Sequence, residues 1–170
     1  NHPSIVMWVP FNEGWGQFQT RKIVKLTQKL DPTRLVNNAS GWSDRQVGDV
    51  IDKHAYPGPG MPAPEANRAA VLGEFGGQAL VVKDHLWLTD FSKAPGHYET
   101  SQSESKLHKS YNKLLRKLIP LKKKGLAAAV YTQTTDVETE VNGFMTYDRA
   151  VVKFNPDELQ ELHKQVIGEN

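Results

Sequence analysis

The sequence predicts an α/β fold whose parallel sheet forms a (β/α)₈ barrel or part of one. Five short apolar runs, rich in β-branched and small residues, alternate with helical or loop segments, as parallel strands with crossovers do. Polar residues follow these runs repeatedly, and barrel ligand sites form at the carboxyl ends of strands. The first run, residues 5–11, predicts a strand buried on both faces that ends at Asn12 and Glu13.

The other elements follow in order from apolar spacing and stop signals. Asn155 and Pro156 supply an N-cap and a first helical residue for the last helix. Residues 78–100 have no helical period and carry His85, Trp87, Phe91, His97 and Tyr98, which predicts a lid or binding loop. The predicted helices span residues 17–30, 101–121 and 155–167, and the later strands lie within 34–40, 49–56, 69–77 and 126–131.

Composition narrows the classes of partner. A chain of 170 residues suits one domain, and a net charge of +2 gives no reason to expect nucleic acid. No apolar run reaches the roughly 20 residues of a membrane span, and the chain has no cysteine for disulfides. The chain opens in a loop without an initiator Met, so we expect a piece of a longer protein and assign no localisation.

Two carboxylates occupy the same architectural position. Glu13 ends the first predicted strand and Glu74 the fourth, so in a barrel both would face one mouth. Glycoside hydrolysis needs such a pair, one carboxyl protonated to assist the leaving oxygen and one ionised to attack the anomeric carbon or activate water. The alternative is that Asn12 and Glu13 only cap the following helix.

Other side chains could complete a sugar pocket. His54, Tyr56 and Tyr131 end intervening or following strands, where they could hold sugar hydroxyls or donate to a carboxylate. Flat indole rings in loops could stack on sugar faces, although half-burial under a loop is the better explanation for any single one of them. These tryptophans are Trp15, Trp42 and Trp87.

Three motifs in matching order resemble one enzyme family. The stretch from Asn1-His2-Pro3-Ser4-Ile5 to Asn12-Glu13 resembles the acid/base signature of glycoside hydrolase family 2, the relatives of β-galactosidase, β-glucuronidase and β-mannosidase. Gly73-Glu74-Phe75-Gly76 resembles the nucleophile motif of that family. Residues 131–149 are similar to the end of the barrel in a β-galactosidase-like branch.

The resemblance implies that residues 1–170 are the C-terminal portion of a TIM-barrel catalytic domain, holding strands four to eight. It implies Glu13 as acid/base, Glu74 as nucleophile and Asn12 as the group that binds the 2-hydroxyl of a β-glycoside. Tyr56 matches a tyrosine that contacts the nucleophile, while His54 and Tyr131 match sugar-facing positions; Tyr131 replaces the tryptophan of several relatives. No metal and no cofactor are implied.

The first three strands and the usual preceding β-sandwich domains have no counterpart here. We therefore expect the fragment to be inactive and to associate with itself through the strand edges at residues 5–11 and 126–131, most simply as a two-fold dimer.

Other classes fit less well. A metal hydrolase is disfavoured because the six histidines form no His-x-x-x-His pair or evident ligand cluster. A nucleotide-binding domain lacks its glycine-rich loop. A non-catalytic carbohydrate-binding or scaffold module stays open as the alternative, although such a module has no need of both Glu13 and Glu74.

Overall fold

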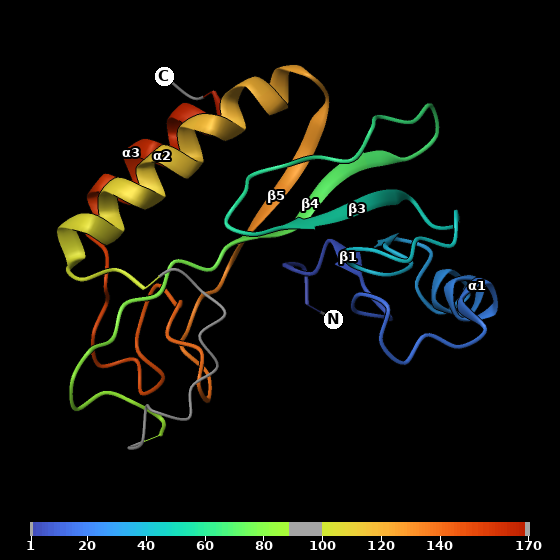
Figure 1. Cartoon of the computed structure of the whole chain (residues 1–170). Coiled ribbons are helices and arrows are strands. Elements are labelled where there is room, and N and C mark those ends of the chain that lie inside the picture. The colour runs from blue at the N-terminus through green and yellow to red at the C-terminus, as the bar shows by residue number, and fades with distance from the viewer. Residues whose placement is uncertain (1, 89–99, 169–170) are drawn as a thin grey trace. The chain divides into compact units, whose positions relative to one another are not determined.

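The computed structural model describes residues 2–88 and 100–168 of the chain. Its elements confirm the predicted order of strands and helices (Figure 1). Phe91, His97 and Tyr98 of the predicted binding loop lie outside the described residues. The elements are β1 (Met7–Trp8), α1 (Thr20–Leu30), β2 (Leu35–Val36), β3 (Val50–Ala55), β4 (Ala69–Gly76), α2 (Glu104–Lys123), β5 (Leu126–Thr132) and α3 (Pro156–Ile167).

The strands form two small sheets, each in chain order. β1 and β2 pair in parallel, with Met7 opposite Leu35, and β3, β4 and β5 form a second sheet in that order. Strands that neighbour each other in sequence also neighbour each other in space, as in a barrel. The structure is therefore of the α/β class, with helical crossovers after β1 and β4 and loops after β2 and β3.

The expected continuous sheet is interrupted between β2 and β3. Asp49 exchanges two hydrogen bonds with Val36: its carboxylate accepts the Val36 N–H at 2.7 Å, and its own N–H donates to the Val36 carbonyl at 2.8 Å. Next to them, an isolated antiparallel bridge joins Asn37 to Gly48. A side chain thus takes the backbone donor that a ladder between β2 and β3 would use.

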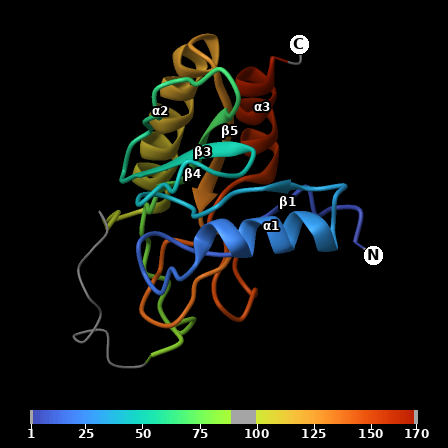
Figure 2. The same ribbon diagram turned by 90° about the vertical axis from the view of Figure 1, so that its right-hand side faces the viewer.

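The described residues divide into two compact units. The first contains residues 2–55, 60–74 and 121–129, and the second contains 56–59, 75–88, 100–120 and 130–168. In the first unit α1 runs beside the β1–β2 sheet (Figure 2). Val24 of α1, Val36 of β2, Val50 of β3 and Leu72 of β4 are buried and supply its core.

In the second unit, α2 buries one face, as its apolar spacing predicts. The Tyr111 hydroxyl of α2 lies 2.8 Å from Nε2 of His163 on α3, which joins the two helices. The cap predicted for α3 is confirmed, because the Asn155 side chain accepts the N–H groups of Asp157 and Glu158. The buried face of α2 comprises Leu107, Tyr111, Leu114, Leu115 and Leu118.

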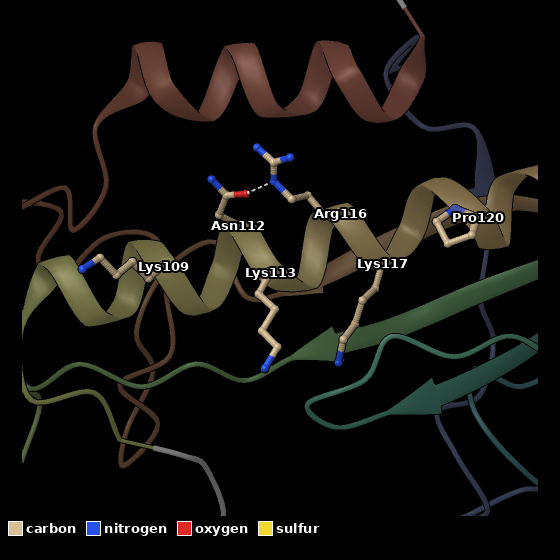
Figure 3. Close-up of a pocket in the computed structure, with 6 residues that line it drawn as sticks. All are labelled: Lys109, Asn112, Lys113, Arg116, Lys117 and Pro120. Carbon is tan, nitrogen blue, oxygen red and sulfur yellow. Dashed lines mark hydrogen bonds between the residues drawn. The ribbon is translucent and has the colours of Figure 1, made fainter.

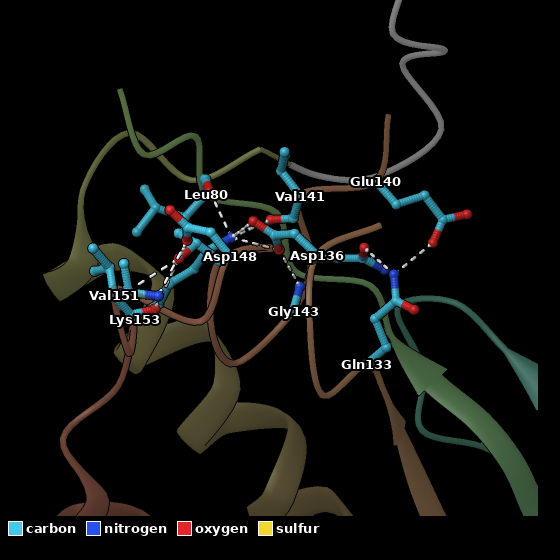
Figure 4. Close-up of polar contacts among 12 residues, drawn as sticks. Leu80, Gln133, Asp136, Glu140, Val141, Gly143, Asp148, Val151 and Lys153 are labelled. Carbon is cyan, nitrogen blue, oxygen red and sulfur yellow. Dashed lines mark hydrogen bonds and ion pairs between the residues drawn. The ribbon is translucent and has the colours of Figure 1, made fainter. Parts of the chain in front are cut away.

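The buried ammonium group of Lys153 binds several groups of the segment that follows β5 (Figure 4). The Nζ of Lys153 donates to the carbonyls of Leu80 and Val141, each at 2.9 Å, and to Asp136 at 2.7 Å. The side chain of Lys153 is 0 % exposed. Burial lowers the pKa of Lys153 and raises that of Asp136, and the contact between the two groups opposes both shifts.

The prediction that residues 5–11 are buried on both faces is wrong within this chain. Val6 is 71 % exposed and Val9 45 %, because β1 pairs only with β2. β5 lies at the edge of its sheet, and Val130 is 52 % exposed. Among the described helices, none has the length and apolar character needed to cross a membrane.

Candidate active site

Glu13 is held in place by its own backbone. Its N–H donates to the Ser40 carbonyl at 2.6 Å, while Asn12 forms an isolated parallel bridge with Ser40. Glu13 has a φ of 55°, the left-handed region that costs a residue with a Cβ roughly 1–3 kcal/mol. Its side chain is 20 % exposed, so the carboxylate reaches solvent from a fixed and strained position.

Glu74 lies in the second half of β4, where the half-buried Gly73 separates it from the three consecutive buried residues 70–72. Its side chain is 28 % exposed. Extended backbone turns successive side chains to opposite faces, so the apolar run before Glu74 fixes the direction in which the carboxylate points.

His54, near the end of β3, brings the two carboxylates together. Its Nδ1 lies 3.1 Å from Oε1 of Glu13 and 3.3 Å from Oε2 of Glu74. One ligand atom from each of the three residues falls within 4.8 Å of the other two. The sequence placed these residues on separate strands, and the structure joins them in one cluster within the first unit.

His54 is supported from its other nitrogen. Nε2 lies 2.7 Å from Oγ of Ser40, and that hydroxyl lies 2.9 Å from Oδ2 of Asp52. Asp52 also accepts from the side chain of Asn37 at 2.6 Å and from the backbone N–H of Gly73 at 2.7 Å. Residues from the segments around Glu13, Ser40, Asp52 and Glu74 of the first unit thus surround one imidazole. The side chain of His54 is 1 % exposed.

Sequence analysis missed Ser40 and Asp52. The signal for Asp52 was available, because residues two apart on a strand share a face and Asp52 and His54 are so spaced. Ser40 lies in an irregular segment after β2, where no periodicity marks a side chain's direction.

The remaining predicted site residues are described separately. Asn12 is exposed and adjoins Glu13. Tyr56 and Tyr131 belong to the second unit, where the Tyr56 hydroxyl donates to Oγ1 of Thr132 at 2.9 Å. The Tyr131 ring stacks on Phe144 with centroids 4.7 Å apart, and burial raises its pKa. Sugar contacts by these residues stay predictions.

The loop tryptophans are exposed. Trp15 is 76 % exposed and Trp42 53 %, and both belong to the first unit. The Trp42 ring stands edge-on to the His54 ring, with centroids 6.0 Å apart. Trp87, in the second unit, is 54 % exposed and contacts the Tyr147 ring. Trp42 therefore combines an exposed side chain with a contact to the His54 ring of the cluster.

By composition, Glu13, His54 and Glu74 are also a set that could hold a metal ion. The histidine spacing in the sequence did not reveal this cluster, since it forms between strands. The distances from Nδ1 to the nearest carboxylate oxygens, 3.1 Å for Glu13 and 3.3 Å for Glu74, are also those of hydrogen bonds.

A hollow of about 510 Å³ lies elsewhere, along α2 (Figure 3). It contains none of the predicted site residues and no carboxylate, so it does not compete with the cluster for the predicted chemistry. Its lining consists of Lys109, Asn112, Lys113, Arg116, Lys117 and Pro120.

Comparison with known proteins agrees with the resemblance. Residues 1–69 match the family model described as Glycosyl hydrolases family 2, TIM barrel domain. The matched stretch contains Glu13, Ser40, Asp52 and His54 and ends before Glu74. No curated protein matches the chain. The predicted similarity to this family and to part of a TIM barrel is thereby confirmed.

Proposed function

We propose that the chain is the C-terminal portion of the catalytic domain of a retaining, β-galactosidase-like glycosidase, a proposal supported by the match of residues 1–69 to the TIM barrel domain of glycosyl hydrolases family 2. In this proposal β1 to β5 are strands four to eight of the barrel. The substrate is a β-linked glycoside. Glu13 is the acid/base and Glu74 the nucleophile.

One observation carries the proposal: two partly exposed carboxylates meet at one buried imidazole. Their approaching atoms lie within 4.8 Å of each other. Retaining enzymes hold their carboxyl groups about 5–5.5 Å apart, whereas inverting enzymes need about 6.5–9.5 Å to admit a water. The short separation supports direct attack by one carboxylate.

The reaction would proceed in two displacements. In the first, the Glu74 carboxylate attacks the anomeric carbon, the glycosidic C–O bond breaks, and the Glu13 carboxyl gives its proton to the leaving oxygen. In the second, Glu13 takes a proton from water, whose oxygen attacks the anomeric carbon and releases the Glu74 carboxylate. Two inversions give net retention.

Neighbouring groups fit substrate binding. Asn12 lies beside Glu13 in an exposed position, which suits a hydrogen bond to the 2-hydroxyl of the sugar. Trp42 offers an exposed ring on which a sugar face could stack. His54 belongs to the same cluster as Glu13 and Glu74. For Tyr56 and Tyr131 of the second unit we propose sugar contacts on the family resemblance alone.

The test uses the complete gene product and a 2-deoxy-2-fluoro aryl β-glycoside, which traps the covalent intermediate. We expect the label on Glu74. Glu74→Ala should lose turnover on all substrates, since no glycosyl-enzyme can form. Glu13→Ala should keep the first step with very good leaving groups and should regain turnover with azide. Equal losses without azide rescue would contradict the two roles.

The alternative, a non-catalytic carbohydrate-binding module, is favoured by the exposed indoles of Trp15 and Trp42. A module would bind the glycoside without becoming labelled. Sugar binding with no label on Glu74 in the complete protein would therefore favour the module.

A further inference from the structure

The imidazole of His54 does not lie free beside the substrate position. Its side chain is 1 % exposed, and protein oxygens lie 2.7 Å from Nε2 and 3.1 Å from Nδ1. Which nitrogen carries hydrogen follows from the partners, because each hydroxyl has one proton and each ionised carboxylate has none.

The Ser40 hydroxyl determines which ring nitrogen of His54 carries a hydrogen. Asp52 accepts from the Gly73 N–H and the Asn37 amide, so it acts as an ionised acceptor toward Ser40 as well. Ser40 therefore gives its one proton to Asp52, at 2.9 Å. The Ser40 oxygen must then accept from His54, which places a hydrogen on Nε2.

The other nitrogen faces two carboxylates. A bare lone pair on Nδ1, 3.1 Å from Glu13 and 3.3 Å from Glu74, would face two acceptors without any hydrogen between them. The cluster therefore holds at least one proton, either on Nδ1 or on a carboxyl group that donates to it. That proton also reduces the repulsion between the two acidic groups.

We infer that His54 is a positioning residue which, oriented by the Asp52–Ser40 hydrogen bond, holds the acid proton of the Glu13–Glu74 site at its Nδ1 side. The inference rests on the proposed function and adds to it the residue that controls the proton. The imidazole acts through Glu13 and touches neither the anomeric carbon nor the leaving oxygen.

The proton held beside Nδ1 would assist both displacements of the reaction. In the first displacement the shared proton passes through Glu13 to the leaving oxygen, leaving Glu13 ionised and Nδ1 without hydrogen. The Nδ1 lone pair then faces the Glu13 carboxylate. This unfavourable contact favours return of one proton from the attacking water to Glu13 in the second displacement, which restores the starting state.

Space around the imidazole agrees with a fixed ring. A Cβ at Gly41 would lie 2.9 Å from Nδ1 and 3.0 Å from Cε1 of His54. Gly41 has a φ of 100°, which glycine alone adopts readily. The chain thus leaves just enough room beside the ring, in a backbone conformation that excludes a side chain.

The first test is independent of activity. Long-range ¹H–¹⁵N correlation spectra of the chain labelled at histidine nitrogens report which ring nitrogen carries hydrogen, with His54→Asn identifying the His54 signals. We expect protonated Nε2 in the unmodified chain. In Asp52→Asn, the Gly73 N–H holds the amide oxygen, so the amide nitrogen replaces Oδ2. The Asn37 amide then turns its unpaired oxygen toward this nitrogen, which also donates to Ser40. Ser40 then donates to Nε2, so the spectra should show Nε2 as the His54 nitrogen without hydrogen.

Ser110→Ala serves as a matched control, because Ser110 lies on α2 in the second unit. It should leave the His54 signals unchanged, while Ser40→Ala should remove the preference for one tautomer. Unprotonated Nε2 in the unmodified chain, or unchanged His54 signals in Asp52→Asn, would overturn the inference.

The second test follows leaving groups in the complete gene product. Asp52→Asn should lower kcat on a β-glycoside with a poor leaving group by about 10²-fold, within the range of general acid catalysis. The loss should be under about tenfold with a very good leaving group, which needs no proton, and Glu74 should still become labelled. An equal loss on both substrates would indicate a merely structural role. Correct tautomers without any hydrolysis would remove the proposed function and leave the proton placement intact.

Discussion

The backbone N–H of Gly73 donates a 2.7 Å hydrogen bond to Oδ1 of Asp52, and a Cβ at Gly73 would overlap Oδ2 of the same carboxylate. This contact gives a physical reason for the glycine that precedes Glu74. Similarly, a Cβ at Gly76 would overlap the ring of Tyr131. The Gly-Glu-Phe-Gly motif thus carries one ionisable residue between two positions that exclude side chains.

Gly73→Ala should therefore disturb the Asp52–Ser40–His54 hydrogen bonds. We expect a loss of stability of about 1–3 kcal/mol from overpacking, and a loss of turnover in the complete gene product. Urea unfolding of the chain measures the first. Gly60→Ala is the control, because its Cβ would lie 3.3 Å from the Ala55 Cβ and meets no carboxylate. Equal effects of the two changes would contradict this account of Gly73.

The buried pair of Lys153 and Asp136 should be a large contributor to the stability of the second unit. Lys153→Met leaves a buried carboxylate without its cation, which costs about 3–5 kcal/mol. Adding Asp136→Asn should recover part of this loss, since the amide carries no charge and its oxygen can still accept the Gly143 N–H. Urea unfolding measures all variants.

The exposed pair of Lys164 and Glu161 provides the comparison for Lys153. Their side chains are 41 % and 67 % exposed, so Lys164→Met should change stability by less than about 1 kcal/mol. A cost for Lys153→Met as small as this would show that the buried pair is not a stabilising centre.

Asp31 should make the stability of the chain fall in acid. Hydrogen bonds from the Thr33 hydroxyl, the Trp8 indole and the Thr33 N–H hold the pKa of Asp31 at about 2. Because the folded pKa lies below the ordinary value of 3.8, the stabilisation is present above about pH 4 and is lost as pH falls toward 2.

Thr33→Val removes the largest of these causes, a 2.6 Å hydrogen bond to Oδ1, so the pKa of Asp31 should rise. Carboxyl NMR titration of the chain measures it. Thr27→Val is the control, because the Thr27 hydroxyl donates to the Ile23 carbonyl within α1. An unchanged Asp31 titration in Thr33→Val would assign the shift to another group.

The chain should associate with itself through its open strand edges. β1 and β5 both lie at sheet edges, with Val6 71 % and Val130 52 % exposed. A lysine at an exposed edge opposes strand pairing, so Val130→Lys should shift the chain toward monomer in sedimentation experiments. Val152→Lys changes an equally exposed valine, 50 % accessible, outside the named strands and should have less effect. A monomeric unmodified chain would contradict the prediction.

The sequence alone determined the order and type of the elements. Helical spacing located α2 and its buried stripe, and Asn155 with Pro156 fixed the start of α3, since caps and periodicity act over a few residues. The motifs around Glu13 and Glu74 also identified the two carboxylates before any geometry was known.

The tertiary structure decided what these elements contact. The break between β2 and β3 depends on the side chain of Asp49, and the exposure of Val6 depends on which strands lie next to β1. Sequence periodicity describes one element at a time and cannot report such neighbours. The link from Asp52 through Ser40 to His54 joins residues on separate segments, so only folding shows that one buried imidazole connects Glu13 and Glu74.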